Sequence, residues 1–145
     1  MGGAVSLATW DRSPLRGFVR GLVLDSPVID WREVMTTQGS ERGLPTPVTA
    51  GALWVMQKRT GIELDRLDWL TRSAELSVPM LVFASRDDTY VRSGSADRLA
   101  AKRPDLVRLI DVAGADHTRS WNVDPVAYEQ ELTRWLTGLG VTAGS

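Results

Sequence analysis

One apolar stretch decides the fold of this chain: Val78-Pro79-Met80-Leu81-Val82-Phe83-Ala84-Ser85. Charged residues follow it directly, in the order Arg86-Asp87-Asp88. A short unbroken apolar run between turn-forming residues is typical of a strand that is buried on both faces of a parallel sheet. We therefore predict a central strand over residues 78–85, whose carboxyl end leads into a polar loop.

Two further short apolar runs, over residues 19–25 and 106–112, have the same character. Helical patterns lie around the three runs, over residues 2–9, in a broken region at 31–72 with a helix at 48–59, from Gly94 or Ser95 to Ala100, and from Asp124-Pro125 to Leu139. Asp followed by Pro is a recognised helix start. Because strands and helices alternate, we predict an α/β fold of three parallel strands with helices on both faces.

The composition excludes several classes of function. The 145 residues include 17 Lys and Arg against 18 Asp and Glu, and the charges are interspersed, so neither nucleic acid nor a membrane surface is an expected partner. The absence of cysteine excludes disulfides and thiolate chemistry, and one histidine excludes a histidine-rich metal site. We expect no metal or organic cofactor. No segment resembles a signal peptide or membrane span, so the default expectation is a cytoplasmic protein, unless a signal precedes the printed sequence.

Reactive side chains follow each predicted strand at its carboxyl end. Asp25 follows the first strand, Asp87 and Asp88 follow the second, and Asp116 and His117 follow the third. In open parallel sheets, ligands and reactive groups gather beyond the carboxyl ends of the strands. A loop histidine is by itself more often a solvated residue, but this position after a strand favours a functional role. The order of these residues therefore predicts a shared site at one edge of the sheet.

The order and surroundings of these residues resemble α/β-hydrolases, whose triad runs Ser, Asp, His along the chain. Residues 79–91 resemble the acid-bearing strand of that family, residues 114–122 its histidine loop and residues 128–136 its terminal helix. The resemblance implies the C-terminal half of an α/β-hydrolase domain, closest to esterase- or peptidase-like members. It implies Asp88 as the catalytic acid and His117 as the catalytic base.

The start of the chain, Met1-Gly2-Gly3-Ala4, resembles the residues that follow the nucleophilic serine in the Gly-x-Ser-x-Gly elbow of that family. The resemblance places the serine just before Met1 and implies the backbone N–H of Met1 as an oxyanion-hole donor. Gly2 and Gly3 would then allow a close approach between helix and strand. Ser6 lies within the first predicted helix and does not replace the nucleophile.

The activity that the resemblance implies is hydrolysis of a small-molecule ester, or less commonly an amide or peptide, through an acyl-enzyme. The alternatives are a truncated, inactive remnant or binding module, and acyl transfer or cofactor-free peroxidation on the same fold. In a truncated chain, the strand at 19–25 would lack a neighbour on one side, which predicts poor solubility. The sequence leaves the oligomeric state open.

Alternatives remain for several other residues. Asp25 lies where some α/β-hydrolases place their acid. We interpret Asp87 as a solvated residue or an ion-pair partner of Arg86, and Asp116 as a turn residue. Asp30 and Asp68 are expected to cap helices.

Residues 31–72 lie where α/β-hydrolases commonly insert a helical cap. Trp54, Met56 and Trp69 could therefore line an acyl or aromatic pocket, or they could be core side chains beneath surface helices. The same two interpretations apply to Trp121.

Overall fold

The computed structural model describes residues 2–141, and within them three parallel strands form one sheet in the order β1-β2-β3. The strands are β1 (Leu22–Asp25), β2 (Met80–Ala84) and β3 (Val107–Asp111). Leu24 lies opposite Val82, which lies opposite Leu109. The predicted α/β fold and its parallel strands are confirmed, although β2 is shorter than predicted. It ends at Ala84 because the hydroxyl of Ser85 accepts the backbone N–H of Asp87 and starts a turn.

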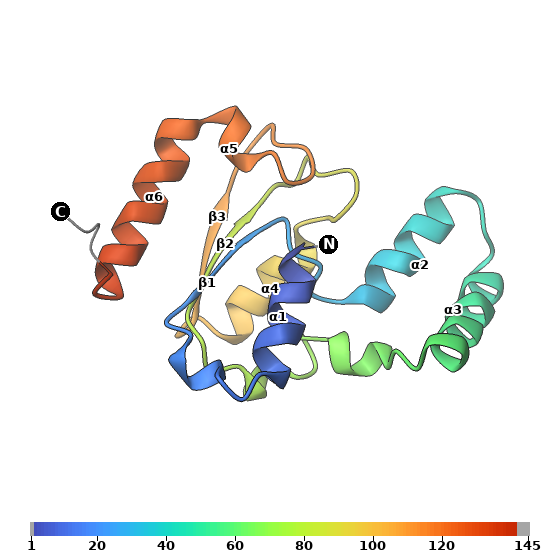
Figure 1. Cartoon of the computed structure of the whole chain (residues 1–145). Helices are drawn as coiled ribbons and strands as arrows, with labels where there is room; N and C mark the ends of the chain where they lie inside the picture. The colour runs from blue at the N-terminus through green and yellow to red at the C-terminus, as the bar shows by residue number, and fades with distance from the viewer. Residues whose placement is uncertain (1, 142–145) are drawn as a thin grey trace.

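Helices cover both faces of the sheet, as predicted (Figure 1). Helices α1 (Gly2–Arg12) and α4 (Gly94–Lys102) pack on one face, and α6 (Pro125–Gly138) packs on the other. The short helix α5 (Ser120–Val123) precedes α6. Asp124 caps α6 by accepting the backbone N–H of Ala127. Helix α1 extends three residues beyond the predicted end and stops just before Ser13 and Pro14.

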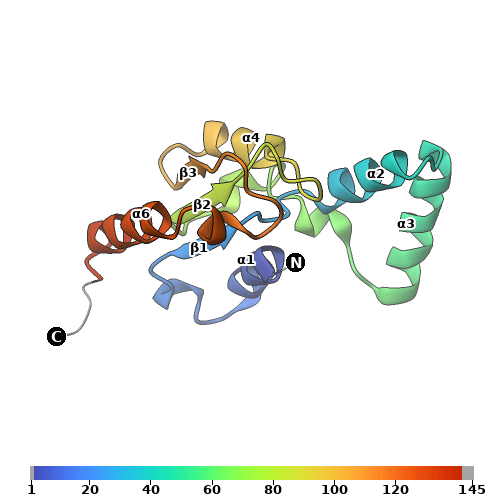
Figure 2. The same ribbon diagram turned by 90° about the horizontal axis from the view of Figure 1, so that it is seen from above.

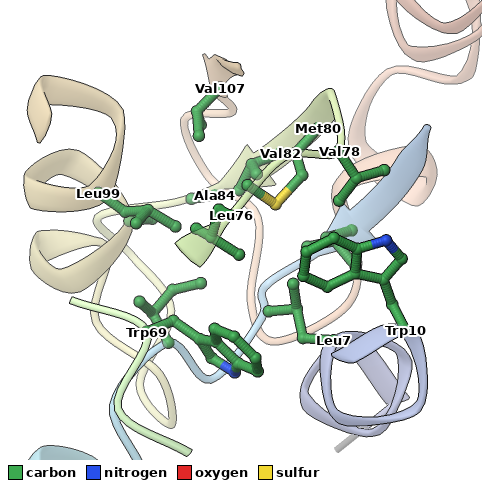
Figure 3. Packing of buried hydrophobic residues seen from close by; sticks show 13 residues of the cluster. Leu7, Trp10, Trp69, Leu76, Val78, Met80, Val82, Ala84, Leu99 and Val107 are labelled. Carbon is green, nitrogen blue, oxygen red and sulfur yellow. The ribbon is translucent and has the colours of Figure 1, made fainter. Parts of the chain in front are cut away.

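The main hydrophobic core lies between the sheet and the helices α1 and α4 (Figure 3). Alternate residues of β2 point into it, beginning with Met80 and Val82, and they meet Leu7 from α1 and Leu99 from α4. Each such side chain contributes about 1.5–3 kcal/mol when fully buried. On the opposite face, the ring of Phe83 stacks on Tyr128 of α6 at a centroid distance of 3.9 Å. Both faces of the central strand are therefore covered.

Residues 31–72 leave the sheet as two helices and return to it, as Figure 2 shows. Helix α2 (Trp31–Glu41) begins at Asp30, whose carboxylate accepts the backbone N–H of Glu33. Helix α3 (Thr46–Thr60) follows, and the 3₁₀ turns η2 (Leu64–Leu67) and η3 (Ser73–Glu75) lead back to β2. The prediction for Asp30 is confirmed, whereas that for Asp68 is wrong. Asp68 accepts the N–H groups of Leu70 and Thr71 in a turn after η2 rather than at the start of a helix.

Strand β1 forms an edge of the described sheet, because β2 is its one neighbour within residues 2–141. Val23 in this strand is 38% exposed, and Phe18 in the η1 turn (Arg16–Phe18) before it is 80% exposed. Unpaired strand edges with apolar neighbours favour association with other chains. Poor solubility therefore stays a prediction, and the unpaired edge of β1 with its exposed apolar neighbours would be its structural cause. None of the helices in the described part of the chain is long and apolar enough to cross a membrane.

Candidate active site

Asp88 and His117 lie side by side at the carboxyl edge of the sheet. The side chain of Asp88 is fully buried, and its Oδ1 accepts the backbone N–H groups of Tyr90 and Val91 at 2.8 and 2.7 Å. Its Oδ2 lies 2.9 Å from Nδ1 of His117. Two backbone hydrogen bonds therefore hold Oδ1 of the carboxylate in place, and Oδ2 is left for the imidazole.

This contact selects one tautomer of the histidine. A carboxylate can only accept hydrogen bonds, so the proton of the neutral imidazole must be on Nδ1, and Nε2 is left as an acceptor. The His117 side chain is 24% exposed, whereas that of Asp88 is shielded from solvent. The ring of Tyr90 lies beside the imidazole at a centroid distance of 5.2 Å. The pair thus presents a basic nitrogen next to a buried negative charge.

Asp87 connects the acid loop to the histidine loop. Its Oδ2 accepts the backbone N–H of Gly114 at 2.7 Å, and Gly114 has the left-handed backbone conformation that glycine favours, with φ of +77°. Arg86 instead lies 3.5 Å from Asp111. The interpretation of Asp87 as an ion-pair partner of Arg86 is therefore wrong, whereas its exposed side chain agrees with the alternative of a solvated residue.

Asp116 makes a second connection between the same two loops. Its Oδ1 accepts the backbone N–H of His117 at 2.8 Å and the hydroxyl of Thr89 at 3.2 Å. The N–H of His117 is the main cause that lowers the pKa of Asp116 below its ordinary value, with a further contribution from Thr89. Asp116 is therefore a turn residue, as predicted, but one that also holds the histidine backbone against the acid loop.

The end of β1 contacts the histidine loop from the other side. Asp25 accepts the hydroxyl of Ser120 at 2.7 Å, and the hydroxyl of Ser26 accepts the backbone N–H of Thr118 at 3.4 Å. The carboxylate bonded to the His117 ring is that of Asp88, not that of Asp25. Ser26 and Thr118 have φ angles of +47° and +58°, a conformation that costs a non-glycine residue roughly 1–3 kcal/mol. Sequence reasoning missed both residues, because neither serine nor threonine signals a left-handed conformation.

The first turn of α1 lies against the residues that follow β1. A Cβ atom at Gly3 would lie 2.9 Å from Cβ and 3.2 Å from Cα of Pro27, whereas one at Gly2 would meet nothing within 4 Å. The predicted close approach is therefore confirmed for Gly3 and wrong for Gly2. Met1, the predicted oxyanion-hole donor, lies outside the described residues.

An apolar cavity of about 370 Å³ lies between α1 and the helical segment 31–72. All of its lining residues are apolar: Ala4, Val5, Ala8, Trp31, Met35, Met56, Ile62, Leu64 and Leu67. Of the three aromatic or Met residues singled out from the sequence, only Met56 lines it, because Trp69 is buried in the main core and Trp54 is 60% exposed. The indole N–H of Trp121 donates to Glu129 at the surface. Across residues 2–141, His, Asp and Glu side chains form no cluster that could hold a metal ion.

No family model matches the sequence, and no curated protein matches it either. Solved structures do match the fold. An esterase from Pyrococcus furiosus is 18% identical over 94% of this chain and 50% of the esterase, with a TM-score of 0.59. An α/β-hydrolase enzyme from the metagenome of sediments of the Mar Chica lagoon, Morocco, is 17% identical over 94% of this chain and 57% of that enzyme, with a TM-score of 0.57.

An acetyl ester-xyloside bifunctional hydrolase from Caldicellulosiruptor lactoaceticus also matches, with 17% identity, 86% of this chain, 44% of that protein and a TM-score of 0.52. The chain thus spans about half the length of the structures that it matches. At these identities the likeness shows the fold. The chain has the fold of about half of an α/β-hydrolase domain.

Proposed function

We propose that this chain supplies the acid and the base of a serine hydrolase that cleaves carboxylic esters through an acyl-enzyme. The observation that carries the proposal is the 2.9 Å contact between the buried carboxylate of Asp88 and Nδ1 of His117. In a Ser-His-Asp triad, the carboxylate holds the imidazole in the tautomer whose other nitrogen can take a proton. The fold shared with esterases favours an ester substrate over an amide.

The proposed mechanism uses each nitrogen of His117 for one task. Nε2 accepts the proton of the serine hydroxyl while the serine oxygen attacks the ester carbonyl carbon. The imidazolium, stabilised by Asp88, then gives that proton to the departing alcohol oxygen, and the acyl-enzyme remains. Water repeats the two steps with its own oxygen as the nucleophile, which releases the acid and restores the serine.

In this proposal the nucleophilic serine comes just before Met1, in the elbow turn that leads into α1. One observation supports this position. Gly3 lies against Pro27, just after the end of β1, so the first turn of α1 lies near the edge that carries Asp88 and His117. The backbone N–H groups at a helix start are free to donate, and the N–H after the serine, that of Met1, would be one oxyanion-hole donor.

A fluorophosphonate probe tests the proposal, because it reacts with a serine that a neighbouring base has activated. We expect the DNA before the Met1 codon to encode an in-frame Gly-x-Ser. The protein extended through that serine should react with the probe, whereas its His117→Ala variant and residues 1–145 alone should not. An extended protein that folds but does not react would favour the alternative, an inactive remnant or binding module. Ester turnover by residues 1–145 that disappears in His117→Ala would place the nucleophile within this chain.

A further inference from the structure

We propose that Gln38 in helix α2 is a positioning residue for the acid of the hydrolase. The inference rests on the function proposed above, because the acid in question is Asp88. Gln38 acts on the acid loop, the stretch after β2 that carries Asp88. Its Nε2 donates to the carbonyl oxygens of Thr89 and Tyr90 in that loop, at 3.3 and 3.4 Å.

These two carbonyl groups belong to the peptide groups that hold the acid. The carbonyl of Thr89 shares its peptide group with the N–H of Tyr90, and the carbonyl of Tyr90 shares its own with the N–H of Val91. Both N–H groups donate to Oδ1 of Asp88, at 2.8 and 2.7 Å. Because a peptide group is planar, a hydrogen bond to its oxygen limits the direction of its N–H. Hydrogen bonds in a chain also polarise one another, so the bonds from Gln38 strengthen those to the acid.

Neighbouring contacts set the orientation of the Gln38 amide. Its Oε1 accepts a hydrogen bond from Arg42 at 2.6 Å, and a guanidinium group can only donate. The amide oxygen therefore faces Arg42, and Nε2 is left for the acid loop. Nε2 also lies 3.2 Å from a carboxylate oxygen of Glu41. Two hydrogens on one nitrogen thus serve three acceptors, so each bond is longer than the usual distance of about 2.9–3.0 Å.

Other side chains of α2 hold the same loop in place. Val34 belongs to one buried cluster with Val91. Glu41 pairs with Arg92 at 2.6 Å. An apolar contact and an ion pair therefore attach α2 to the residues that follow Tyr90, which keeps the amide of Gln38 within reach of its two carbonyl oxygens.

The contacts of Gln38 reach the imidazole by a second route. Tyr90 is held at both of its backbone groups, because its N–H donates to Asp88 and its carbonyl accepts from Gln38. Its ring lies beside the imidazole of His117 at a centroid distance of 5.2 Å. Loss of the Gln38 amide should therefore loosen two neighbours of His117. Gln38 lies outside the lining of the apolar cavity, so we expect this loss to lower kcat rather than to raise KM.

Amide hydrogen exchange on residues 1–145, followed by NMR, tests the contact directly. Gln38→Met keeps the length of the side chain but cannot donate to the carbonyl oxygens. It should raise the exchange rates of the Tyr90 and Val91 N–H groups roughly fivefold, which corresponds to one net hydrogen bond. The N–H of Met80, which donates to Leu106 within the sheet, is the internal reference for the stability of the whole fold. Rates of Tyr90 and Val91 that stay unchanged relative to Met80 would overturn the proposal.

Two further variants separate positioning from a general structural role. Gln57→Met is the matched control, because Oε1 of Gln57 accepts the backbone N–H of Leu64 at 3.0 Å within the helical segment. It should leave the exchange ratios at the parent values. Gln38→Glu keeps an acceptor for Arg42 but has no hydrogen to donate, so it should raise the ratios at least as much as Gln38→Met. Parent-like ratios in Gln38→Glu would mean that the bond to Arg42 is what matters, which would contradict the proposal.

Steady-state kinetics of the protein extended through the proposed serine tests the consequence for the reaction. Gln38→Met should lower kcat on the order of tenfold and leave KM within about twofold, whereas Gln57→Met should leave both unchanged. In an Asp88→Asn background, Gln38→Met should cause no further loss, because its effect passes through the carboxylate. A loss of kcat that persists in full in that background would overturn the proposal.

The exchange experiment needs no nucleophile, so the two proposals can fail separately. Altered exchange at Tyr90 and Val91 in an extended protein without turnover would contradict the proposed hydrolase alone. Turnover of the extended protein with unaltered exchange in Gln38→Met would contradict the role of Gln38 alone.

Discussion

The carboxyl edge of the sheet and the helical segment 31–72 are built by different interactions. At the edge, short polar contacts determine the positions of the loops, as between Asp88 and His117 and between Asp87 and Gly114. In the helical segment, apolar side chains surround a cavity, and α3 leaves Trp54 and Val48 exposed. Hydrogen bonds are directional and weaken steeply when atoms shift, whereas apolar burial depends mainly on area. Changes at the edge should therefore affect the reaction, whereas changes in the wall of the cavity should affect which ligand is held.

The largest expected effect concerns the acid and the base. In the protein extended through the proposed serine, Asp88→Asn should lower kcat on the order of 10⁴-fold and His117→Ala at least as much. Met56→Ala, in the cavity wall, should change KM for long-chain esters and leave kcat within a few-fold. Steady-state kinetics on p-nitrophenyl esters of increasing chain length measures both. A fall in kcat for Met56→Ala as large as that for Asp88→Asn would remove the distinction between the two regions.

A smaller effect is expected where α1 meets the end of β1. Gly3→Ala should lower the free energy of unfolding by about 1–3 kcal/mol, because the added Cβ would overlap Pro27. Gly2→Ala is the matched control in the same turn and meets no neighbour, so it should be neutral or stabilise by up to about 1 kcal/mol. Urea unfolding of the two variants measures the difference. Equal stabilities would mean that the first turn does not pack against Pro27.

A comparable cost is expected for one hydrogen bond at the edge. Ser120→Ala removes the buried hydroxyl that donates to Asp25 and should cost about 1–3 kcal/mol of unfolding free energy. The exposed Ser40 of α2 serves as the control in the helical segment, and Ser40→Ala should stay within about 0.5 kcal/mol of the parent. Thermal unfolding of both variants at one pH provides the comparison. A larger loss of unfolding free energy in Ser40→Ala than in Ser120→Ala would contradict the conclusion that side-chain hydrogen bonds stabilise the sheet edge more than the helical segment.

The smallest effect is a change in acid stability. The pKa of Asp116 is lower in the folded chain than its ordinary value. At pH values between the folded and the unfolded pKa, the unfolded chain therefore binds more protons than the folded chain. The stabilisation from Asp116 is therefore complete above the unfolded pKa of about 3.9 and is lost as the pH falls through the folded value. In Asp116→Asn, the unfolding free energy should depend less steeply on pH below about 4. An unchanged slope in urea titrations at several pH values would contradict this role.

The sequence predicts those features that depend on local patterns. The apolar run at 78–85 predicts the central strand, because a strand buried on both faces has no polar face to alternate. The motif around Asp88 and the loop of His117 predict a pair at one sheet edge, and the structure places the two side chains in contact.

The features that could not be predicted from the sequence depend on contacts between residues that are far apart in the chain or that have no local signature. The bond from Gly114 to Asp87 joins positions 27 residues apart. The left-handed conformation of Ser26 has no signature in its neighbours. Likewise, Gly2 and Gly3 are indistinguishable in sequence, and only the position of Pro27 separates them. The sequence also could not decide whether Met56 and Trp69 belong to a pocket or to the core, since both are apolar residues in helical surroundings.

The most direct test of the central claim is the tautomer of His117, read from the ¹⁵N shifts of its ring by NMR on residues 1–145. One histidine in the chain makes the assignment unambiguous. At a pH where the imidazole is neutral, the account predicts a protonated Nδ1 and an unprotonated Nε2. Asp88→Ala should abolish this preference, whereas Asp25→Asn should retain it. A proton on Nε2 in the parent chain, or a preference that depends on Asp25 instead, would contradict the claim that Asp88 prepares His117 to act as a base.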